Sequence, residues 1–296
     1  MKTLFRALGW LLAGLCGLLL LGFAWVLYIT HSFDTKTLPA RHGQFDLALH
    51  AQAQPGRPLI LALGGAEGGN MWNSERWRGQ VERFNAQGYN VLTLAYFGTP
   101  TTPARLDRID LGALHRAARE TMDRPELQSR CLIALGGSKG AELSLALAAH
   151  FEDIDAVVAM SPADTVFPAH TEAMTTSSWS IDGQPLPFAP MPWAALPDLI
   201  RGDIGAVMAR MRAQPEAAAA RIRTEKIEAP VLLIASEQDE MWPALSMARE
   251  IEARAPSRVR VLAVPGDHRA VVDHMAAVED FLREVVAERP NCGSGE

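Results

Sequence analysis

The chain has 296 residues, 48% of them hydrophobic, and a formal net charge of −6 at pH 7. A chain of this size and composition can bury one large core, so we expect a single globular domain over residues 36–296. Lysine and arginine are scattered rather than clustered, which argues against a nucleic-acid partner. The three cysteines, Cys16, Cys131 and Cys292, are too few for a disulfide framework. We expect them to be structural fillers that do not report the redox compartment.

The first predicted element lies at the N-terminus. Residues 7–29 contain no charged side chain and follow the basic residues Lys2 and Arg6. As a helix this segment would be about 35 Å long, enough to cross the hydrocarbon core of a bilayer. Trp25 and Tyr28 near its end are residues typical of membrane interfaces. The sequence therefore predicts a single-pass anchor within residues 1–35, with the membrane as a partner through residues 7–29.

The sequence leaves an alternative open for this segment. A cleaved signal peptide should have a shorter apolar stretch, and the one small-x-small exit, Gly22-Phe23-Ala24, lies inside the apolar run. Lys2 and Arg6 favour a cytoplasmic N-terminus, and Lys36 and Arg41 after the segment make this bias weak. For the anchored form we expect a bacterial inner membrane, with the rest of the chain on its non-cytoplasmic side.

The first predicted strand of the domain, over 58–63, is an apolar run that leads into the glycine-rich loop 64–69. Glycines let the main chain approach a ligand closely. A phosphate-binding loop is the rival interpretation, but the segment lacks the Gly-Lys-Ser/Thr of a P-loop and the spacing of a dinucleotide fingerprint. We expect the backbone N–H of Gly65 or Ala66 to face a substrate oxygen instead.

The most informative turn of the chain follows a strand predicted over 131–135, after a strand over 90–95 and a helix over 109–124. Its sequence, Gly136-Gly-Ser-Lys-Gly140, has the pattern G-x-S-x-G and opens an apolar helix over 139–151. In such a nucleophile elbow a strained backbone pushes the serine hydroxyl above the sheet edge, and only glycine fits on either side. An ordinary glycine-serine connector is the alternative. The flanking strand and helix favour Ser138 as a nucleophile.

Beyond the elbow, the predicted helix is apolar almost all round, with Glu142 as the exception. We expect this carboxylate to be stabilised by the helix N-terminus, with a role in orienting the site as the alternative. A strand over 156–160 follows, and then residues 161–198 show no clear period and contain seven prolines. We interpret residues 161–205 as a cap over the site, with a purely structural excursion as the alternative. Aromatic walls suit an apolar acyl pocket, so Trp179, Phe188 and Trp193 are candidates for substrate binding.

The next predicted strand, over 231–235, ends at a loop that contains three carboxylates. Enzymes with a nucleophile elbow carry an acid after the serine in chain order and a histidine after the acid. Asp239 has the position in the pattern that the acid should have. Glu237 and Glu240 share its loop and are the alternatives.

The last predicted strand, over 259–264, runs into Pro265-Gly-Asp-His268. A helical spacing of apolar residues from Val271 to Val285 follows. His268 therefore lies on a loop at a strand end, where a general base is expected. His274, on the helix, is expected to be a surface residue.

Together these residues predict acyl transfer to a serine. His268 would take the proton of Ser138, and Asp239 would fix the imidazole tautomer. The backbone N–H of Lys139, with that of Gly65 or Ala66, would form the oxyanion hole. This chemistry requires no cofactor and no metal ion. The alternation of strands and helices predicts an α/β-hydrolase fold with a doubly wound, mostly parallel sheet, a cap insertion and one N-terminal transmembrane helix.

Four segments resemble one known family in the same order along the chain: GGSKGAELSLALA at 136–148, SSWSIDGQPLPF at 177–188, SEQDEMWPA at 236–244 and PGDH at 265–268. The chain over 58–288 resembles the C-terminal catalytic domain of the acyl-CoA thioester hydrolase and bile acid-CoA:amino acid N-acyltransferase family. The resemblance implies Ser138 as nucleophile, Asp239 as acid and His268 as base. The family's amino acid N-acyltransferases carry a cysteine as nucleophile, so Ser138 favours hydrolysis over transfer. Many members also place an N-terminal sandwich domain before the catalytic one, whereas about thirty residues stand here between the apolar segment and the first strand.

Two classes of function are compatible with these observations. The first is a serine hydrolase that cleaves acyl thioesters, with a membrane-anchored carboxylesterase or lipase acting on oxygen esters as the alternative, because the same acyl chemistry serves both. The second is a non-catalytic hydrolase-fold binding module. A complete set of serine, aspartate and histidine favours the enzyme. The expected partner is a small-molecule acyl thioester or ester, and the oligomeric state stays open.

Overall fold

A computed structural model describes residues 2–52 and 54–293 of the chain. Its main sheet has seven strands in the order β1-β3-β2-β5-β6-β9-β10, and every strand is parallel to its neighbours except the edge strand β1. The strands are β1 (Asp46–His50), β2 (Leu59–Leu63), β3 (Asn90–Ala95), β5 (Leu132–Gly137), β6 (Ala156–Met160), β9 (Val231–Ser236) and β10 (Val259–Val264). This topology confirms the predicted doubly wound, mostly parallel sheet.

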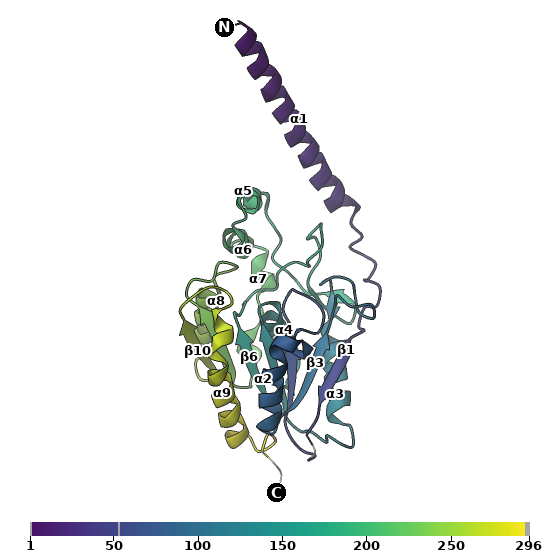
Figure 1. The fold of residues 1–296 in the computed structure, drawn as a ribbon, viewed down its shortest axis with the longest axis vertical. Helices are drawn as coiled ribbons and strands as arrows, with labels where there is room; N and C mark the ends of the chain where they lie inside the picture. The colour runs from purple at the N-terminus through teal and green to yellow at the C-terminus, as the bar shows by residue number, and fades with distance from the viewer. Residues whose placement is uncertain (1, 53, 294–296) are drawn as a thin grey trace.

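Helices cover both faces of the sheet (Figure 1). Alternate residues of a strand point to opposite faces, and β2 shows this clearly: Leu59, Leu61 and Leu63 belong to one apolar cluster, and Ile60 and Ala62 to the other. The first cluster includes side chains of α3 (Leu111–Met122), α4 (Lys139–His150) and α8 (Ala244–Arg254). The second includes side chains of α2 (Glu75–Ala86) and α9 (Met275–Glu288). With both faces covered, the carboxyl ends of the parallel strands are the place for a site.

The helix predicted over 109–124 begins later than expected. Ile109 and Asp110 form a short strand, β4, that pairs with β7 (Trp179–Ile181) in a second sheet of three strands completed by β8 (Gln184–Pro185). The side chain of Asp110 accepts a hydrogen bond from the N–H of Ala113 at 3.0 Å. An aspartate cap of this kind starts a helix at the next residue, which is why α3 begins at Leu111.

The cap is longer than the predicted 161–205. Between β6 and β9 it contains β7, β8, the short 3₁₀ helices η2 (Trp193–Ala195) and η3 (Thr224–Lys226), and the helices α5 (Leu196–Arg201), α6 (Ile204–Arg212) and α7 (Ala217–Ala220). Gly202 ends α5 in the left-handed conformation, and the Asp203 side chain caps α6 by accepting from the N–H of Ala206 at 3.0 Å. A second cap helix therefore starts directly after the turn at 202–203, and the cap extends beyond residue 205.

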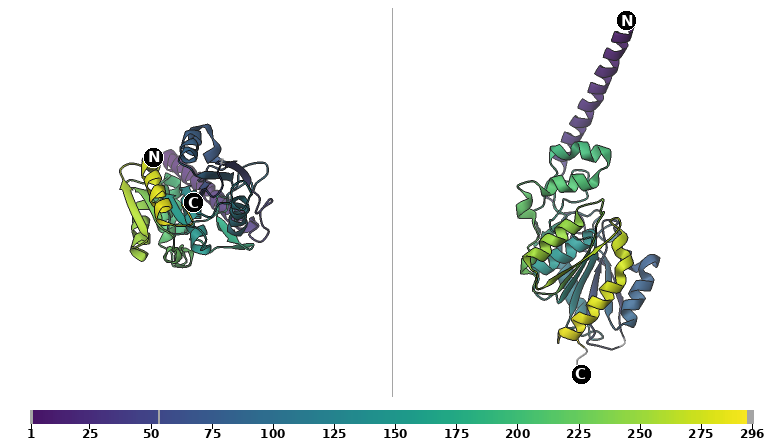
Figure 2. Two further views of the ribbon diagram at one scale, coloured as in Figure 1. Left: turned by 90° about the horizontal axis from the view of Figure 1, so that it is seen from below. Right: turned by 90° about the vertical axis from the view of Figure 1, so that its left-hand side faces the viewer.

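The N-terminal helix α1 (Lys2–Ser32) projects from the end of the molecule that carries the cap, opposite the C-terminus (Figures 1 and 2). Residues Phe5–Ser32 are long and apolar enough to cross a membrane, and none of the most apolar window is buried against the domain. A signal sequence near an N-terminus has the same length and composition. The predicted helix is thus present.

Two of the cysteines are not fillers. Cys131, at the start of β5, and Cys292, after α9, form a disulfide across a sequence separation of 161 residues, and both side chains are fully buried. The expectation that the cysteines are unpaired was wrong, because the fold returns the C-terminal segment to the amino edge of the central strand. Cys16, on α1, is the free cysteine of the described residues.

Candidate active site

The turn between β5 and α4 has the geometry of a nucleophile elbow. Ser138 has φ 55° and ψ −120°, a region that residues with a side chain rarely adopt. A Cβ atom on Gly136 would lie 2.1 Å from the carbonyl oxygen of Gly140, and one on Gly140 would lie 2.4 Å from that of Gly64. Neither glycine can therefore carry a side chain without a shift of backbone. This close packing against β2 holds the strained serine at the carboxyl edge of the sheet.

The structure brings Ser138, His268 and Asp239 together from three separate strand ends. His268 Nε2 lies 2.9 Å from Ser138 Oγ. On the other side of the ring, Nδ1 lies 2.8 Å from Asp239 Oδ2 and 2.9 Å from Oδ1. With Nδ1 protonated and donating to the carboxylate, Nε2 is the acceptor for the serine hydroxyl. This is the arrangement in which a histidine can withdraw the serine proton.

The three carboxylates of the 236–242 loop differ in what they contact. Asp239 has a side chain that is 1% exposed, and its Oδ1 also accepts from the N–H groups of Met241 at 2.9 Å and Trp242 at 3.2 Å. Glu240 accepts from the backbone N–H of His268 at 2.9 Å, and so holds the histidine loop rather than the imidazole. Glu237 is exposed. Asp239 is thus the carboxylate that meets His268 Nδ1.

The position of the imidazole is fixed on further sides. Ser161 Oγ donates to the carbonyl of His268 at 2.8 Å. The buried ring of Trp242 meets the imidazole edge-on, with centroids 5.2 Å apart and planes at 89°. Sequence inspection did not single out either residue, because only the fold brings the ends of β6 and β9 against the histidine loop.

The two candidate oxyanion loops also meet at Ser138. Lys139 is the first residue of α4, so its N–H has no acceptor within the helix. In the glycine-rich loop, the N–H of Gly65 donates to the Glu67 carboxylate at 3.1 Å and is therefore engaged. Among the described residues, the N–H of Ala66 has no protein acceptor. Of the two alternatives, Ala66 is the one with a donor free for a substrate oxygen.

The carbonyls of the glycine-rich loop are held from behind by a tyrosine. The Tyr96 hydroxyl contacts the carbonyl oxygens of Gly64 at 2.6 Å and Gly65 at 3.0 Å. Burial raises the pKa of Tyr96 well above its ordinary value, and the nearby Glu67 and Glu142 act in the same direction. The hydroxyl stays protonated and can donate to the loop.

A buried ion pair is formed by Lys139, the residue after Ser138, and Glu142. Lys139 Nζ is 2.7 Å from Glu142 Oε2, with the two side chains 1% and 0% exposed. Glu142 Oε1 accepts from Trp179 Nε1 at 2.7 Å and from the N–H of Phe167 at 3.2 Å. Burial lowers the pKa of Lys139 and raises that of Glu142, and the attraction within the pair opposes both shifts. Glu142 thus joins α4 to the cap, and its main partners are side chains rather than the helix N-terminus expected from sequence.

A cleft of about 700 Å³ opens over Ser138 and His268. Apolar side chains and five charged ones line it: Met71, Trp77, Met160, Met241, Val271 and Val272, with Glu67, Arg76, Glu240, Asp267 and Arg269. The aromatic residues predicted to bind substrate do not line this cleft. Trp179 is fully buried on Glu142, Phe188 packs on the core, and Trp193 is 55% exposed and contacts Phe23 of α1. Trp77, from α2, is an aromatic wall that the sequence did not reveal, because nothing marked α2 as a neighbour of the elbow.

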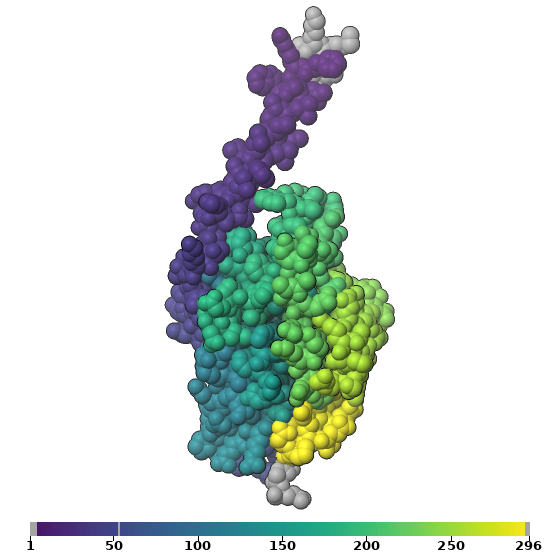
Figure 3. All heavy atoms as spheres, turned by 180° about the vertical axis from the view of Figure 1, so that it is seen from behind, coloured from purple at the N-terminus to yellow at the C-terminus, as the bar shows by residue number. Residues whose placement is uncertain are grey.

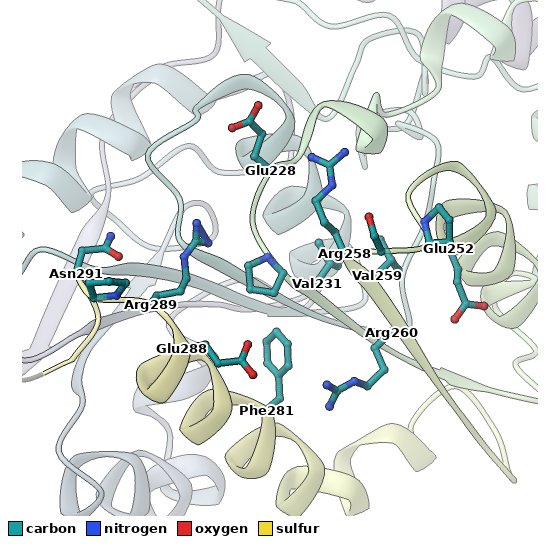
Figure 4. Close-up of a pocket in the computed structure, with 14 residues that line it drawn as sticks. Glu228, Val231, Glu252, Arg258, Val259, Arg260, Phe281, Glu288, Arg289 and Asn291 are labelled. Carbon is teal, nitrogen blue, oxygen red and sulfur yellow. The ribbon is translucent and has the colours of Figure 1, made fainter.

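A second groove, of about 750 Å³, lies at the opposite edge of the sheet (Figure 4). It surrounds Val231 and Val259, the first residues of β9 and β10. Its charged lining is balanced, with Glu228, Glu252 and Glu288 against Arg258, Arg260 and Arg289. None of the elbow, acid-loop or histidine-loop residues borders it. The groove is separate from the chemistry described above.

The fold and the elbow define the class as an α/β hydrolase. Among solved structures, the chain is similar to Est1E from Butyrivibrio proteoclasticus with bound ferulic acid, with a TM-score of 0.54, 18% sequence identity, and coverage of 82% of this chain and 96% of that one. This likeness concerns the fold. The family model for the C-terminal domain of BAAT and acyl-CoA thioester hydrolases matches residues 111–260. The chain belongs to that family, as the sequence motifs implied.

Two curated relatives from mouse illustrate the family. Acyl-coenzyme A amino acid N-acyltransferase 1 is 27% identical over 218 residues, which cover 71% of this chain and 49% of that protein. Acyl-coenzyme A thioesterase 1 is 28% identical over 127 residues, which cover 43% of this chain and 29% of that protein. The chain spans about half the length of the first relative and less of the second.

Proposed function

We propose that the protein is a membrane-anchored serine hydrolase that cleaves acyl thioesters or esters through an acyl-enzyme. The observation that carries this proposal is the continuous contact from Ser138 Oγ through the His268 imidazole to the Asp239 carboxylate, with heavy-atom distances of 2.9 and 2.8 Å. These distances lie within the range over which a base can take a proton from a nucleophile. A serine rather than a cysteine at position 138 supports hydrolysis over transfer to an amino acid.

In the proposed reaction, Ser138 Oγ attacks the acyl carbonyl while His268 Nε2 takes the hydroxyl proton. The developing oxyanion would accept hydrogen bonds from the N–H groups of Lys139 and Ala66, each worth about 3 kcal/mol in comparable sites. Collapse breaks the bond to the leaving thiol or alcohol, which receives the proton from His268. A water molecule then repeats the two steps on the acyl-serine and releases the carboxylic acid.

Labelling of Ser138 tests the proposed role directly. A fluorophosphonate probe should react with the wild-type protein, because the probe captures a serine that a histidine has activated. The Ser138→Ala variant should show neither labelling nor ester hydrolysis and should melt at the wild-type temperature. Labelling that persists in this variant would remove Ser138 from the mechanism.

The leaving group has two candidate chemistries. Family membership supports a thioester. The disulfide between Cys131 and Cys292 supports a fold matured in an oxidising compartment, where coenzyme A thioesters are scarce and lipid esters are present. It also supports the predicted non-cytoplasmic side for the domain. Hydrolysis of a coenzyme A thioester and an oxygen ester with the same acyl chain, compared by kcat/KM, decides between the two.

Anchoring by α1 is part of the proposal. The uninterrupted apolar stretch, whose most apolar window contains no buried residue, supports a bilayer as its surroundings. Recovery of the intact chain in membranes washed with alkaline carbonate tests this, and a soluble product that begins after α1 would indicate a cleaved signal sequence instead.

A further inference from the structure

The cap carries a small exposed apolar surface. Trp193 is 55% exposed, Leu199 37% and Ile200 76%. Outside α1, Leu47 is the other large apolar side chain that is exposed among the described residues. The three cap residues lie within eight positions on η2 and α5, and we call them the cap tip. Three such side chains grouped on one short helical segment, rather than scattered singly, indicate a surface with a partner.

The cap tip lies beside α1. The ring of Trp193 packs on Phe23 with centroids 5.5 Å apart. Figure 3 shows the atoms of the cap beside the last part of the N-terminal helix, and Figure 1 places α5 at the same end of the molecule. The cap tip is therefore in contact with the helix whose length and composition suit a membrane span.

The position of this contact along α1 sets the depth of the cap tip. From Ala7, where the uncharged segment begins, to Phe23 an α-helix rises about 24 Å. The hydrocarbon core of a bilayer is about 30 Å thick. Phe23 would then lie in the outer part of the core, and Trp25 and Tyr28, which pack on each other, would lie at its boundary. Trp193 meets α1 just inside this boundary.

The charges around the cap tip suit lipid headgroups. Arg201 and Arg210 both pair with the buried Asp198, and their side chains are 63% and 51% exposed. Both guanidinium groups are thus exposed next to Leu199 and Ile200, and the exposed Asp203 at the start of α6 is a second carboxylate of the same region. Apolar side chains flanked by arginine are typical of surfaces that lie in a membrane interface.

We propose that the cap tip inserts into the interface of the bilayer that α1 crosses, and that the enzyme takes its acyl substrate from that bilayer. The inference rests on the proposed hydrolase and its anchor, and deepens them by naming a membrane-resident substrate class. The cap tip is also close to the cleft. The helix α6 begins three residues after Arg201, and its second residue, Gly205, packs tightly on the backbone of Glu240: a Cβ atom added to Gly205 would lie 2.9 Å from the Glu240 carbonyl oxygen. Glu240 lines the cleft and holds the N–H of His268.

A fluorescent label at the cap tip tests the insertion in the full chain. In a Cys16→Ser background, an environment-sensitive nitrobenzoxadiazole dye is attached at Ile200→Cys, and the protein is placed in nanodiscs of equal parts phosphatidylcholine and phosphatidylglycerol. We expect blue-shifted emission, and at least twofold quenching by lipid that carries a doxyl group close to the headgroup. The matched control carries the dye at Glu126→Cys, an exposed position in the loop before β5, and should not be quenched.

The outcomes of this measurement distinguish whether lipid or protein covers the cap tip. A blue shift without doxyl quenching would mean that protein, such as a second copy of the chain, covers the tip, and would overturn the proposal. Equal quenching at positions 200 and 126 would also overturn it. The measurement does not depend on catalysis, so it remains decisive even if the proposed hydrolase activity is wrong.

A charge substitution tests the consequence for substrate. Ile200→Glu should lower hydrolysis of a long-chain ester held in the nanodisc by about tenfold or more, because a carboxylate opposes insertion into the interface. Hydrolysis of a water-soluble short-chain ester should stay at the wild-type rate. Leu47→Glu, which makes the same kind of change at an exposed residue of β1, should alter neither rate. An Ile200→Glu protein with wild-type rates on both substrates would overturn the proposal and leave the hydrolase assignment intact.

Discussion

The contacts of single carboxylates distinguish roles that the sequence left open. Asp239, Glu237 and Glu240 share one loop, and position in a pattern was the only basis for choosing among them. Burial and hydrogen bonds separate them: Asp239 is enclosed and meets the imidazole, Glu240 meets the backbone of His268, and Glu237 is exposed. A linear pattern cannot show this, because side-chain direction in a loop depends on its tertiary contacts.

Substitution of each carboxylate by its amide tests these roles. Asp239→Asn should favour the wrong imidazole tautomer and lower kcat by about 10⁴, or about 5 kcal/mol, as the same change does in a serine protease. Glu240→Gln keeps an oxygen that can accept the N–H of His268, so we expect a loss of less than about tenfold. Glu237→Gln should behave as wild type.

One ester-hydrolysis assay near neutral pH, with the melting temperature as a check on folding, covers all three variants. A folded Asp239→Asn protein that retains more than about a tenth of wild-type kcat would contradict the assignment of the acid.

The buried ion pair of Lys139 and Glu142 predicts a large loss of stability when one of the two charges is removed. Glu142→Gln can still accept from Trp179 and Phe167 but leaves the Lys139 ammonium buried without its counter-charge. Loss of one partner of a buried pair costs about 3–5 kcal/mol. We expect the free energy of unfolding to fall by about that amount in Glu142→Gln.

The double variant Lys139→Met/Glu142→Gln removes both charges, keeps the backbone N–H of residue 139, and should recover much of the lost stability. Urea unfolding of the wild type, both single variants and the double variant measures the coupling. Additive losses would show that the two charges do not depend on each other.

At the scale of elements, regular strands were predictable and the cap was not. The strands over 90–95, 156–160 and 259–264 have the predicted bounds. The first two are fully buried, and the edge strand over 259–264 is partly buried and carries the exposed Arg260, but each is a mainly apolar run between turn residues. The cap consists of elements of two to nine residues that hold each other through tertiary contacts. Trp179 illustrates the limit: an aromatic residue in a proline-rich stretch fits a pocket wall, yet its indole N–H is committed to Glu142.

The elbow is the element whose sequence and geometry agree most closely, and Gly140→Ala tests why. The new Cβ would lie 2.4 Å from the Gly64 carbonyl oxygen and 2.5 Å from that of Leu63, so α4 must move away from β2. Overpacking of this kind costs about 1–3 kcal/mol, and a displacement of the nucleophile by about 1 Å can cost on the order of 10²-fold in rate.

We therefore expect a folded Gly140→Ala protein with a lower melting temperature and at least tenfold slower fluorophosphonate labelling. Gly79→Ala, at a helical glycine with open space around its Cβ position, is the matched control and should label at the wild-type rate. Wild-type labelling of Gly140→Ala would show that the close approach of α4 to β2 is dispensable.

In the molecule as a whole, one end of the domain carries the proposed site and the other end carries the disulfide. The carboxyl ends of the strands, the cap and α1 gather at one end, where the proposed site and membrane contact lie (Figure 2). The other end is closed by the disulfide, which ties the chain after α9 to the start of β5. Two cysteines separated by 161 residues give no local signal of pairing, since only the folded sheet brings them together.

The disulfide leads to a prediction for the whole domain. A crosslink that closes a loop of 161 residues restricts the unfolded chain, and by loop-closure entropy it contributes about 5 kcal/mol, with 2–4 kcal/mol the usual measured range. Cys292→Ser should therefore lower the free energy of unfolding by about 3 kcal/mol and the melting temperature by roughly 10 °C. Because both sulfurs are buried, a reductant should act on the wild type only after unfolding.

Wild-type protein refolded in reductant should melt at the temperature of Cys292→Ser, and the variant should be insensitive to reductant. A wild type whose melting temperature is the same after refolding with and without reductant would show that the two cysteines are not paired, and would remove the support that the disulfide gives to a non-cytoplasmic domain.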